Sequence, residues 1–280
     1  MGGPTVKCRL RVVVVIFVFF NSFSTHLFAQ TTANDELKLG VQAYKHSKFE
    51  EAIDHFGKCV ALDPGNTVAH LYLATAFAQQ YIPGADTPEN NRMAEQAIDQ
   101  YQHVLDGNPE TSAKLNSTKG IAYLYLQMKK FDDSKKYYRL ASDADPDDPE
   151  TYYSVGVIDW TLTYVPRQEK RARLDMKPEE ALWTKDRMAC FEMKEKNTAN
   201  IQEGIDSLDK AIQLRPDYDD AMAYMNLMYR EKADVECDDL AARKKDLRTA
   251  DDWVDRTMAT KKAKAEKAAP STEPAGTNPQ

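Results

Sequence analysis

Residues 39–66, LGVQAYKHSKFEEAIDHFGKCVALDPGN, place small residues, aromatics and a late proline at intervals that fit neither one amphipathic helix nor a strand. If the stretch is divided after Lys45, both halves carry apolar residues on a helical period. Gly40 and Ala52 are small enough for two helices to approach each other closely. Pro64 has no backbone N–H and ends the second helix. The stretch therefore predicts two helices joined by a short turn.

A helix pair of this size cannot bury its apolar face alone, so the unit is expected to recur along the chain. It resembles the tetratricopeptide repeat (TPR), whose 34-residue pattern has small residues at positions 8 and 20, an aromatic near 24 and proline at 32. In residues 33–66 these positions are occupied by Gly40, Ala52, Phe56 and Pro64. Residues 115–148 match again without a gap, through Ala122, Tyr125, Ser134, Tyr138, Ala141 and Pro146.

The spacing of the prolines reveals two longer repeats. Pro64 and Pro109 are 45 residues apart, and Pro146 and Pro216 are 70 apart, so the intervening units exceed one repeat by 11 and 36 residues. We assign residues 67–111 to a second repeat and 149–218 to a fourth, each with an insertion between its two helices. The fourth repeat departs from the family pattern at position 11, which is Asp159.

The end of the chain is less regular. Residues 219–267 fit a degenerate fifth repeat, whose last helix, from about Ala241 to Lys267, is expected to cap the array with a polar outer face. Residues 268–280 are rich in proline and small polar residues and are expected to be a disordered tail. The resemblance thus implies an all-α fold, a right-handed α-solenoid of TPR helix-turn-helix repeats with two intra-repeat insertions.

Residues 1–29 do not fit this architecture. Three basic residues precede the apolar run VVVVIFVFF at 12–20, and the segment ends in HLFA, which is typical of a secretory signal peptide. A membrane anchor is the alternative, but nine apolar residues are about half of the roughly 20 needed to span a bilayer. We expect cleavage after Ala29, an exported protein that is periplasmic or extracellular, and no membrane span in the mature chain.

The charge balance disfavours one class of partner. Cleavage would remove three positive charges and no negative ones, which takes the formal net charge from −7 to −10. Such a chain repels phosphate backbones, and no basic stripe with interleaved aromatics is present in the sequence. Nucleic acid is therefore not an expected partner.

Three cysteines would remain after export. Cys59 falls at a packing position of the first repeat, where a thiol behaves as a small hydrophobe. Cys190 lies in the insertion of the fourth repeat and Cys237 lies between the helices of the fifth. Loops of stacked repeats emerge at the same edge, so these two could meet and form a disulfide in an oxidising compartment. Two unrelated thiols are the alternative.

Motifs for chemistry are weak. Residues 143–150, DADPDDPE, place acids at the first ligand offsets of a calcium loop, but Asp148 stands where glycine is needed and Ser154 where a bidentate glutamate is needed. The same acids also suit a helix N-terminus. The sequence contains no zinc motif, nucleophile elbow or Gly-rich phosphate loop. We expect no metal, no cofactor and no enzymatic activity.

The resemblance also implies a binding surface, because the first helices of TPR arrays line a concave groove. The groove positions of the pattern correspond to Tyr44, Lys45, Leu71, Thr75, Lys119, Tyr123, Tyr153, Val157, Trp160 and Arg230. Tyrosine, tryptophan and arginine dominate interface energetics, so this face is expected to bind a peptide or protein. Some of these rings could instead only pack between neighbouring helices.

The carboxylate clamp of chaperone-binding TPR proteins is absent, because its positions hold Leu37, Val41, Tyr72, Asn116 and Gly120. In the insertions, residues 80–91 favour an ordered, turn-rich loop. In residues 161–199, Pro178 and the glutamates after it favour a helix start. Apolar residues of this second insertion either cover the end of the solenoid or contact a partner: Trp183, Phe191 and Met193.

The sequence therefore predicts a non-enzymatic scaffold or assembly factor of the bacterial cell envelope that binds a peptide or protein of unknown identity. One alternative is an envelope carrier or sensor that binds a small apolar ligand against Tyr123, Tyr153 and Trp160. A second is an enzyme whose site is assembled from distant residues.

Overall fold

The computed structural model describes residues 1–2, 31–177 and 180–268. The signal peptide predicted for 1–29 and the tail predicted for 268–280 fall almost entirely outside these ranges, as does Pro178. All described helices belong to the compact unit that begins at Thr32. None of them is long and apolar enough to cross a membrane.

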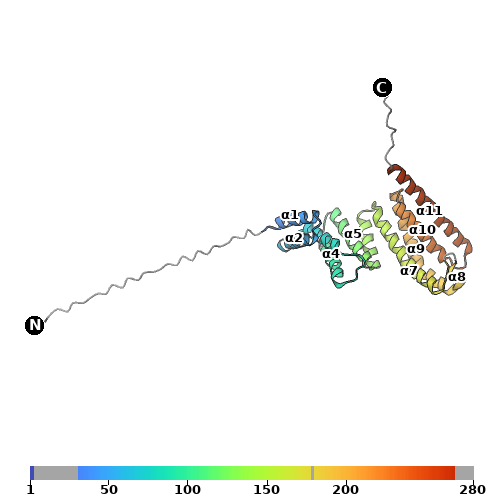
Figure 1. Ribbon diagram of the computed structural model, residues 1–280, viewed down its shortest axis with the longest axis horizontal. Helices are drawn as coiled ribbons and strands as arrows, with labels where there is room; N and C mark the ends of the chain where they lie inside the picture. The colour runs from blue at the N-terminus through green and yellow to red at the C-terminus, as the bar shows by residue number, and fades with distance from the viewer. Residues whose placement is uncertain (3–30, 178–179, 269–280) are drawn as a thin grey trace, which may run out of the picture. The chain divides into compact units, whose positions relative to one another are not determined.

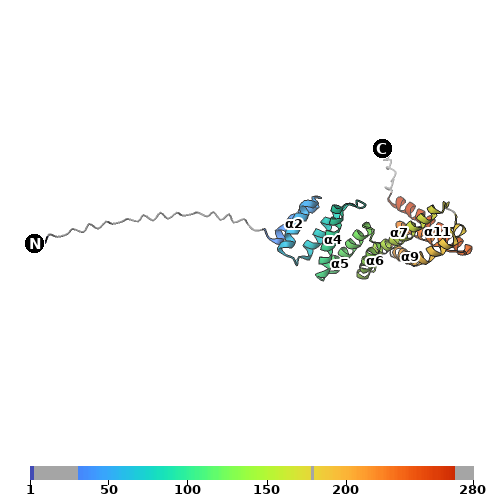
Figure 2. The ribbon, with the colours of Figure 1, turned by 90° about the horizontal axis from the view of Figure 1, so that it is seen from below.

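The described residues form helices and no strand. The helices are α1 (Ala33–Lys45), α2 (Phe49–Leu62), α3 (Thr67–Gln80), α4 (Pro88–Asp106), α5 (Thr111–Gln127), α6 (Phe131–Ala144), α7 (Pro149–Arg173), α8 (Leu182–Lys185), α9 (Arg187–Leu214), α10 (Asp219–Asp234) and α11 (Leu240–Ala268). They pack as five pairs, α1 with α2, α3 with α4, α5 with α6, α7 with α9 and α10 with α11. Each pair stacks on the next (Figures 1 and 2), so the predicted all-α solenoid of helix pairs is confirmed.

Small residues set the distance within a pair. A Cβ atom on Gly40 of α1 would lie 2.5 Å from the ring of Phe56, which is fully buried on α2. In the fourth pair, a Cβ atom on Gly156 of α7 would lie 2.5 Å from Leu208 of α9. Contacts this short are not tolerated, so the two glycines are required by the close approach of the helices.

The first insertion is ordered, as expected, but only part of it is a loop. The chain leaves α3 at Tyr81 and re-enters a helix at Pro88, so the last residues of 80–91 lengthen α4 instead. The buried Asn90 fixes the loop: its side chain accepts a hydrogen bond from the Ile82 amide at 2.7 Å and donates to the carbonyls of Ile82 at 2.9 Å and Ala85 at 2.7 Å.

The second insertion mostly lengthens the helices of the fourth pair. α7 continues to Arg173, and α9 begins at Arg187 after a short connection that contains α8. Asp186 caps α9 by accepting a hydrogen bond from the Ala189 amide at 2.9 Å. The helix start expected at Pro178 falls outside the described residues, and the next described helices begin at Leu182 (α8) and Arg187 (α9).

Side chains of the second insertion largely join the core. Trp183 and Met193 pack in the apolar cluster shared by α9 and α10, whereas Phe191 remains 41% exposed. The structure also joins Cys190 of α9 to Cys237, which follows α10, with Cα atoms 5.9 Å apart, while Cys59 is free and buried. The insertion is thereby linked covalently to the last repeat.

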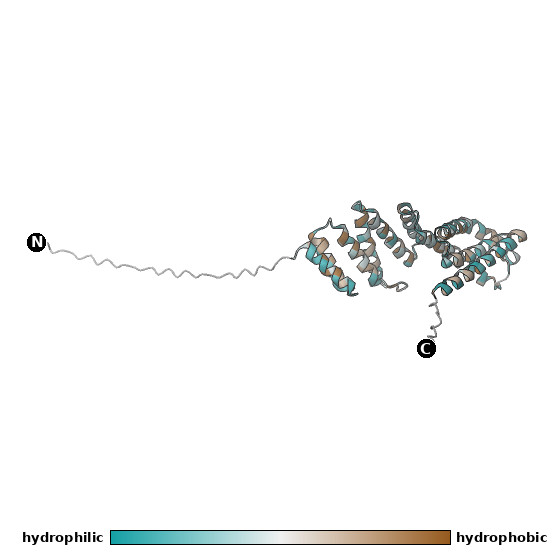
Figure 3. Ribbon diagram, turned by 90° about the horizontal axis from the view of Figure 1, so that it is seen from above, coloured by the Kyte–Doolittle hydropathy of each residue, from teal (hydrophilic) through white to brown (hydrophobic). Residues whose placement is uncertain are grey.

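Helix α11 ends the described array. It buries a strip of only three residues, Asp246, Ala250 and Thr257. Figure 3 shows the last turns of α11, next to the label C, in the teal of hydrophilic residues. Most residues of α11 are exposed, as expected for a helix with no further repeat packed on it in the described part of the chain.

The close approach of α1 and α2 predicts opposite effects of alanine at two glycines. Gly40→Ala is expected to reduce the free energy of unfolding by about 1–3 kcal/mol, because its Cβ would collide with Phe56. Gly57→Ala is expected to increase it by up to about 1 kcal/mol, because no atom lies within 4 Å of the added Cβ and alanine favours helix. Urea unfolding of both variants would measure this, and equal effects would contradict it.

Reduction of the disulfide is expected to destabilise the C-terminal repeats. Cys190 and Cys237 are separated by 47 residues, and closing a loop of this size stabilises a fold by about 4 kcal/mol at most in the chain-entropy model. The double variant Cys190→Ala/Cys237→Ala should melt at a lower temperature than the oxidised protein. Mass spectrometry of the unreduced protein after alkylation would contradict the pairing if all three thiols were modified.

Candidate functional site

Two adjoining cavities lie along the first helices of the first three repeats. One, of about 440 Å³, is lined by Tyr44, Leu71, Tyr72, Thr75, Tyr101 and Asn116. The other, of about 540 Å³, is lined by Thr75, Ala78, Gln79, Tyr81, Tyr101, Lys119, Gly120, Tyr123, Tyr138 and Ser154. Because they share Thr75 and Tyr101, the cavities form one continuous surface, which we call the tyrosine groove.

The floor of the tyrosine groove comes from second helices. Tyr101 of α4 passes between α3 and α5, and its hydroxyl lies 3.3 Å from the Thr75 hydroxyl. A Cβ atom on Gly120 would lie 2.6 Å from the Tyr101 ring, so a larger residue there would exclude it. Burial raises the pKa of the Tyr101 phenol. Tyr138 of α6 lines the same surface.

The structure brings five of the expected groove residues together. The tyrosine groove is lined by Tyr44, Leu71, Thr75, Lys119 and Tyr123, and Tyr123 is the most exposed aromatic side chain among them, at 44%. Lys45 is exposed but lines neither cavity. Tyr101 and Tyr138 were missed as lining residues because the repeat pattern assigns their positions to packing between helices.

The expected groove residues of the fourth repeat do not line the tyrosine groove. The ring of Tyr153 lies 5.7 Å from that of Tyr224, and the ring of Trp160 lies 5.3 Å from it, both edge to face. Tyr224 belongs to α10, so these rings fill the seam between α7 and α10. Burial raises the pKa of Tyr153 to about 12. Arg230 lines a separate cavity with Arg167 and does not share a surface with Tyr123.

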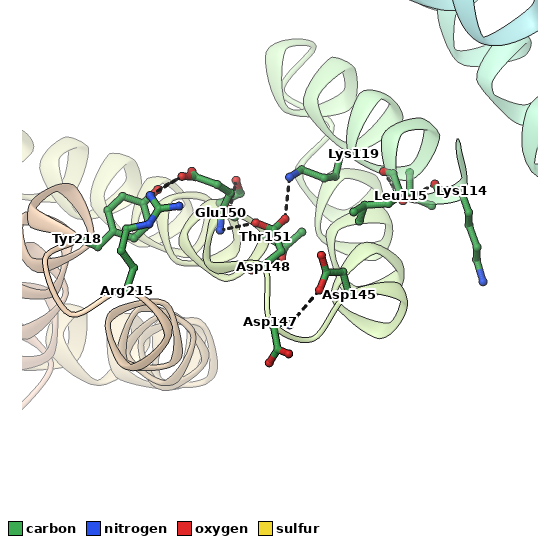
Figure 4. A network of polar contacts seen from close by, with 12 residues as sticks. Lys114, Leu115, Lys119, Asp145, Asp147, Asp148, Glu150, Thr151, Arg215 and Tyr218 are labelled. Atoms are coloured by element: carbon green, nitrogen blue, oxygen red, sulfur yellow. Dashed lines mark hydrogen bonds and ion pairs between the residues drawn. The ribbon is translucent and has the colours of Figure 1, made fainter. Parts of the chain in front are cut away.

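The acidic stretch at 143–150 is engaged in helix ends and ion pairs (Figure 4). Asp148 caps α7 and accepts a hydrogen bond from Lys119 Nζ at 2.7 Å, so the one lysine of the groove is neutralised. Asp145 accepts a hydrogen bond from the Asp147 amide at 3.2 Å. Glu150 binds Arg215 at 2.7 Å and the Tyr218 hydroxyl at 2.5 Å. Within the described residues, no group of three ligands could hold a metal ion.

Asp159, which departs from the repeat pattern at position 11, takes part in a buried ion pair. The Asp159 carboxylate is fully buried and accepts a hydrogen bond from Lys135 Nζ of α6 at 2.5 Å. The same ammonium group lies 2.7 Å from the Glu203 carboxylate of α9. Burial raises the pKa of Asp159 to about 7, although the hydrogen bond from Lys135 opposes the shift. These contacts connect the third repeat to the fourth, beside the groove rather than in it.

Comparison with known proteins supports the repeat assignment. A family model described as tetratricopeptide repeat matches residues 120–148, inside the predicted third repeat. No curated protein matches the chain.

Solved structures share its fold at low identity. A crystal structure of MamA is 13% identical with a TM-score of 0.56, covering 85% of this chain and 96% of that chain. MamA from Desulfovibrio magneticus RS-1 is 14% identical with a TM-score of 0.54, covering 82% and 96%. YrrB, described as a TPR protein with an unusual peptide-binding site, is 13% identical with a TM-score of 0.51, covering 83% and 92%.

The buried carboxyls predict that acid stabilises this protein over part of the pH range. Burial raises the pKa of Asp159, ordinarily 3.8, and of Glu231, ordinarily 4.5, to about 7. The folded state therefore binds these protons more tightly than the unfolded state, and stability falls as pH rises through about 7. The melting temperature should be higher at about pH 5.5 than at about pH 8.

The variant Asp159→Asn isolates the contribution of one carboxyl. Its melting temperature should change less between the two pH values, because Glu231 is then the one of these two carboxyls whose pKa is still raised to about 7. A melting temperature that rises with pH in the unmodified protein, or an identical pH response in Asp159→Asn, would contradict the assignment.

Proposed function

Because the chain is a tetratricopeptide-repeat protein, we propose that it holds a peptide or protein segment in the tyrosine groove and acts as a non-enzymatic scaffold or assembly factor. The observation that carries this proposal is the joining of two cavities into one surface along α1, α3 and α5. A continuous groove suits an extended segment, since residues spaced along a peptide can contact successive repeats.

The chemistry of the groove indicates the kind of segment that it takes. Its lining combines tyrosine rings with hydroxyl and amide groups, so it offers apolar area together with hydrogen-bond partners for a peptide backbone. Lys119 is neutralised by Asp148, which leaves little positive charge for an acidic peptide. We therefore propose an uncharged segment with aromatic or aliphatic side chains. The peptide-binding site named for YrrB makes such a role reasonable for this fold.

The two alternatives find less support. A small apolar ligand held by Tyr123, Tyr153 and Trp160 would need these rings at one site, whereas Tyr153 and Trp160 pack on Tyr224. For an enzyme, the carboxyls with strongly raised pKa are the natural candidates, but Asp159 is bound by Lys135 and Glu231 lies 2.8 Å from Arg167. Burial explains the raised pKa values, which these two ion pairs oppose, so the shifts need no reaction to account for them.

We also propose that the protein is exported and works in the bacterial envelope. The proposal rests on the signal-like sequence of residues 1–29 and on the pairing of Cys190 with Cys237. Disulfides of this kind persist in oxidising compartments outside the cytoplasm.

Removal of the Tyr123 ring is expected to weaken peptide binding. Peptides would be selected from a random display library on the folded protein and measured by fluorescence anisotropy. Tyr123→Ala should weaken binding by about tenfold or more, as expected for an interface tyrosine. Leu140→Ala is the matched control, because Leu140 is similarly exposed, at 41% against 44%, and lines neither groove cavity.

Comparison with Leu140→Ala shows whether weaker peptide binding is specific to the tyrosine groove. Equal weakening by both variants, or unchanged binding in Tyr123→Ala, would count against the groove. Selected peptides that are predominantly acidic would contradict the proposed chemistry of the partner.

A further inference from the structure

The aromatic lining of the tyrosine groove consists of tyrosines alone. Each first helix of the first three repeats supplies one of them, Tyr44 from α1, Tyr72 from α3 and Tyr123 from α5. Among the described residues, three more tyrosines line the groove: Tyr81, which follows α3, Tyr101 of α4 and Tyr138 of α6. A ligand therefore meets aromatic rings along the whole length of the groove.

Many polar groups of the groove are available to a ligand. Within the described ranges of the chain, four of its tyrosine hydroxyls and two side-chain amides make no hydrogen bond to the protein. They belong to Tyr44, Tyr72, Tyr81, Tyr123, Gln79 and Asn116. The Tyr101 hydroxyl differs, because it lies 3.3 Å from the Thr75 hydroxyl. Each free hydroxyl or amide can donate a hydrogen bond to a ligand.

The charge of the groove suits an uncharged ligand. Lys119 is the one charged residue among the described residues that line the two cavities, and its ammonium group lies 2.7 Å from the Asp148 carboxylate. A charged ligand would lose its hydration here without finding an unpaired charge in return. The groove must therefore select its ligand by shape and hydrogen bonding.

The two cavities of the groove are displaced from each other by one repeat. The lining of the first runs from α1 to α5, and the lining of the second runs from α3 to α7. Neighbouring first helices contact each other directly, α1 with α3 and α3 with α5. Packed helices lie about 8–10 Å apart. The groups of a ligand that fill the two cavities should be separated by a similar distance.

A polyproline II helix has this spacing. It rises about 3.1 Å per residue with three residues per turn, so residues three apart lie on one side and about 9 Å from each other. The pitch of an α-helix is about 5.4 Å, and residues on one face of a strand are about 6.8 Å apart. Neither of these two conformations places consecutive residues of one face in the two cavities.

Hydrogen bonding favours the same conformation. A polyproline II helix has no internal hydrogen bonds, so its carbonyl groups are free to accept from the hydroxyls and amides of the groove. No carboxylate lines either cavity among the described residues, so the groove has few strong acceptors for peptide N–H groups. Proline has no backbone N–H and leaves none unpaired. Grooves lined by aromatic side chains are a recurring binding surface for such segments.

We propose that the segment held in the tyrosine groove is proline-rich and adopts the polyproline II conformation, with residues three apart occupying the two cavities. This inference rests on the proposed peptide binding and adds the chemistry of the partner. Because proline fixes its own φ angle, such a segment loses little conformational entropy when it binds.

Fluorescence anisotropy of labelled peptides with the disulfide-bonded protein tests the proposal. The probe is a peptide of four Ala-Pro-Pro units. Its matched control has the same composition, but one proline of each unit is D-proline, which disrupts the left-handed helix. The L-proline peptide should bind at least about tenfold more tightly than this control, because only it is already in the bound conformation. This comparison requires no variant of the protein.

Two variants then locate the binding site. Tyr123→Ala should weaken binding of the L-proline peptide by about tenfold or more. Leu140→Ala should leave it within about twofold, because Leu140 lines neither cavity of the groove. Equal weakening by the two variants would overturn the proposal.

A second peptide separates this inference from the proposed function. It is the tightest proline-free, uncharged peptide obtained from the display library. Binding of that peptide that is weakened by Tyr123→Ala, together with no preference for the L-proline peptide over its D-proline control, would overturn the inference and leave the proposed function standing. Failure of both peptides to bind in a manner that depends on Tyr123 would overturn both.

Discussion

The close approach of neighbouring helices at small residues is the constraint on which this structure depends. Gly40 and Gly156 let Phe56 and Leu208 lie directly against a helix backbone, and each contact closes one helix pair. A helix pair still leaves apolar surface that only the next pair covers, so the array is stable as a stack of neighbours. Gly120 allows the same kind of close contact between two repeats, because the absence of a side chain leaves room for the Tyr101 ring. Packing and function are thereby connected, because that ring is part of the groove floor.

The fourth repeat shows what lengthened helices add to such an array. Helices α7 and α9 are longer than the helices of the three preceding repeats. Both pack against α10. The added turns include buried charges, because Arg167 and Arg171 of α7 both pair with Asp234 of α10. Replacing buried ion pairs by apolar residues is often neutral or stabilising, so these pairs are weak evidence for stability. They connect the lengthened α7 directly to α10.

The tyrosine groove and the disulfide lie in different parts of the array. The groove is a nearly neutral surface of rings and hydroxyl groups, whose single lysine is paired with Asp148. The disulfide joins Cys190 of α9 to Cys237, which follows α10. Reduction of the disulfide would therefore act on the packing of α9 and α10 and not directly on the groove residues.

The sequence by itself determined the helix pairs and their order, because the contacts within one repeat are local and recur with its period. It determined the groove of the first three repeats only in part, since it missed Tyr101 and Tyr138 and included Lys45, which lines neither cavity. Because of the repeat period, it could also place Tyr44, Leu71 and Tyr123 on one surface. Only the tertiary structure decided that Trp160 packs on Tyr224, that Arg230 faces another cavity and that the second insertion lengthens helices. These outcomes depend on how α7 and α9, longer than the repeat pattern provides, meet α10 and α11, and contacts between residues so distant in the chain leave no period in the sequence.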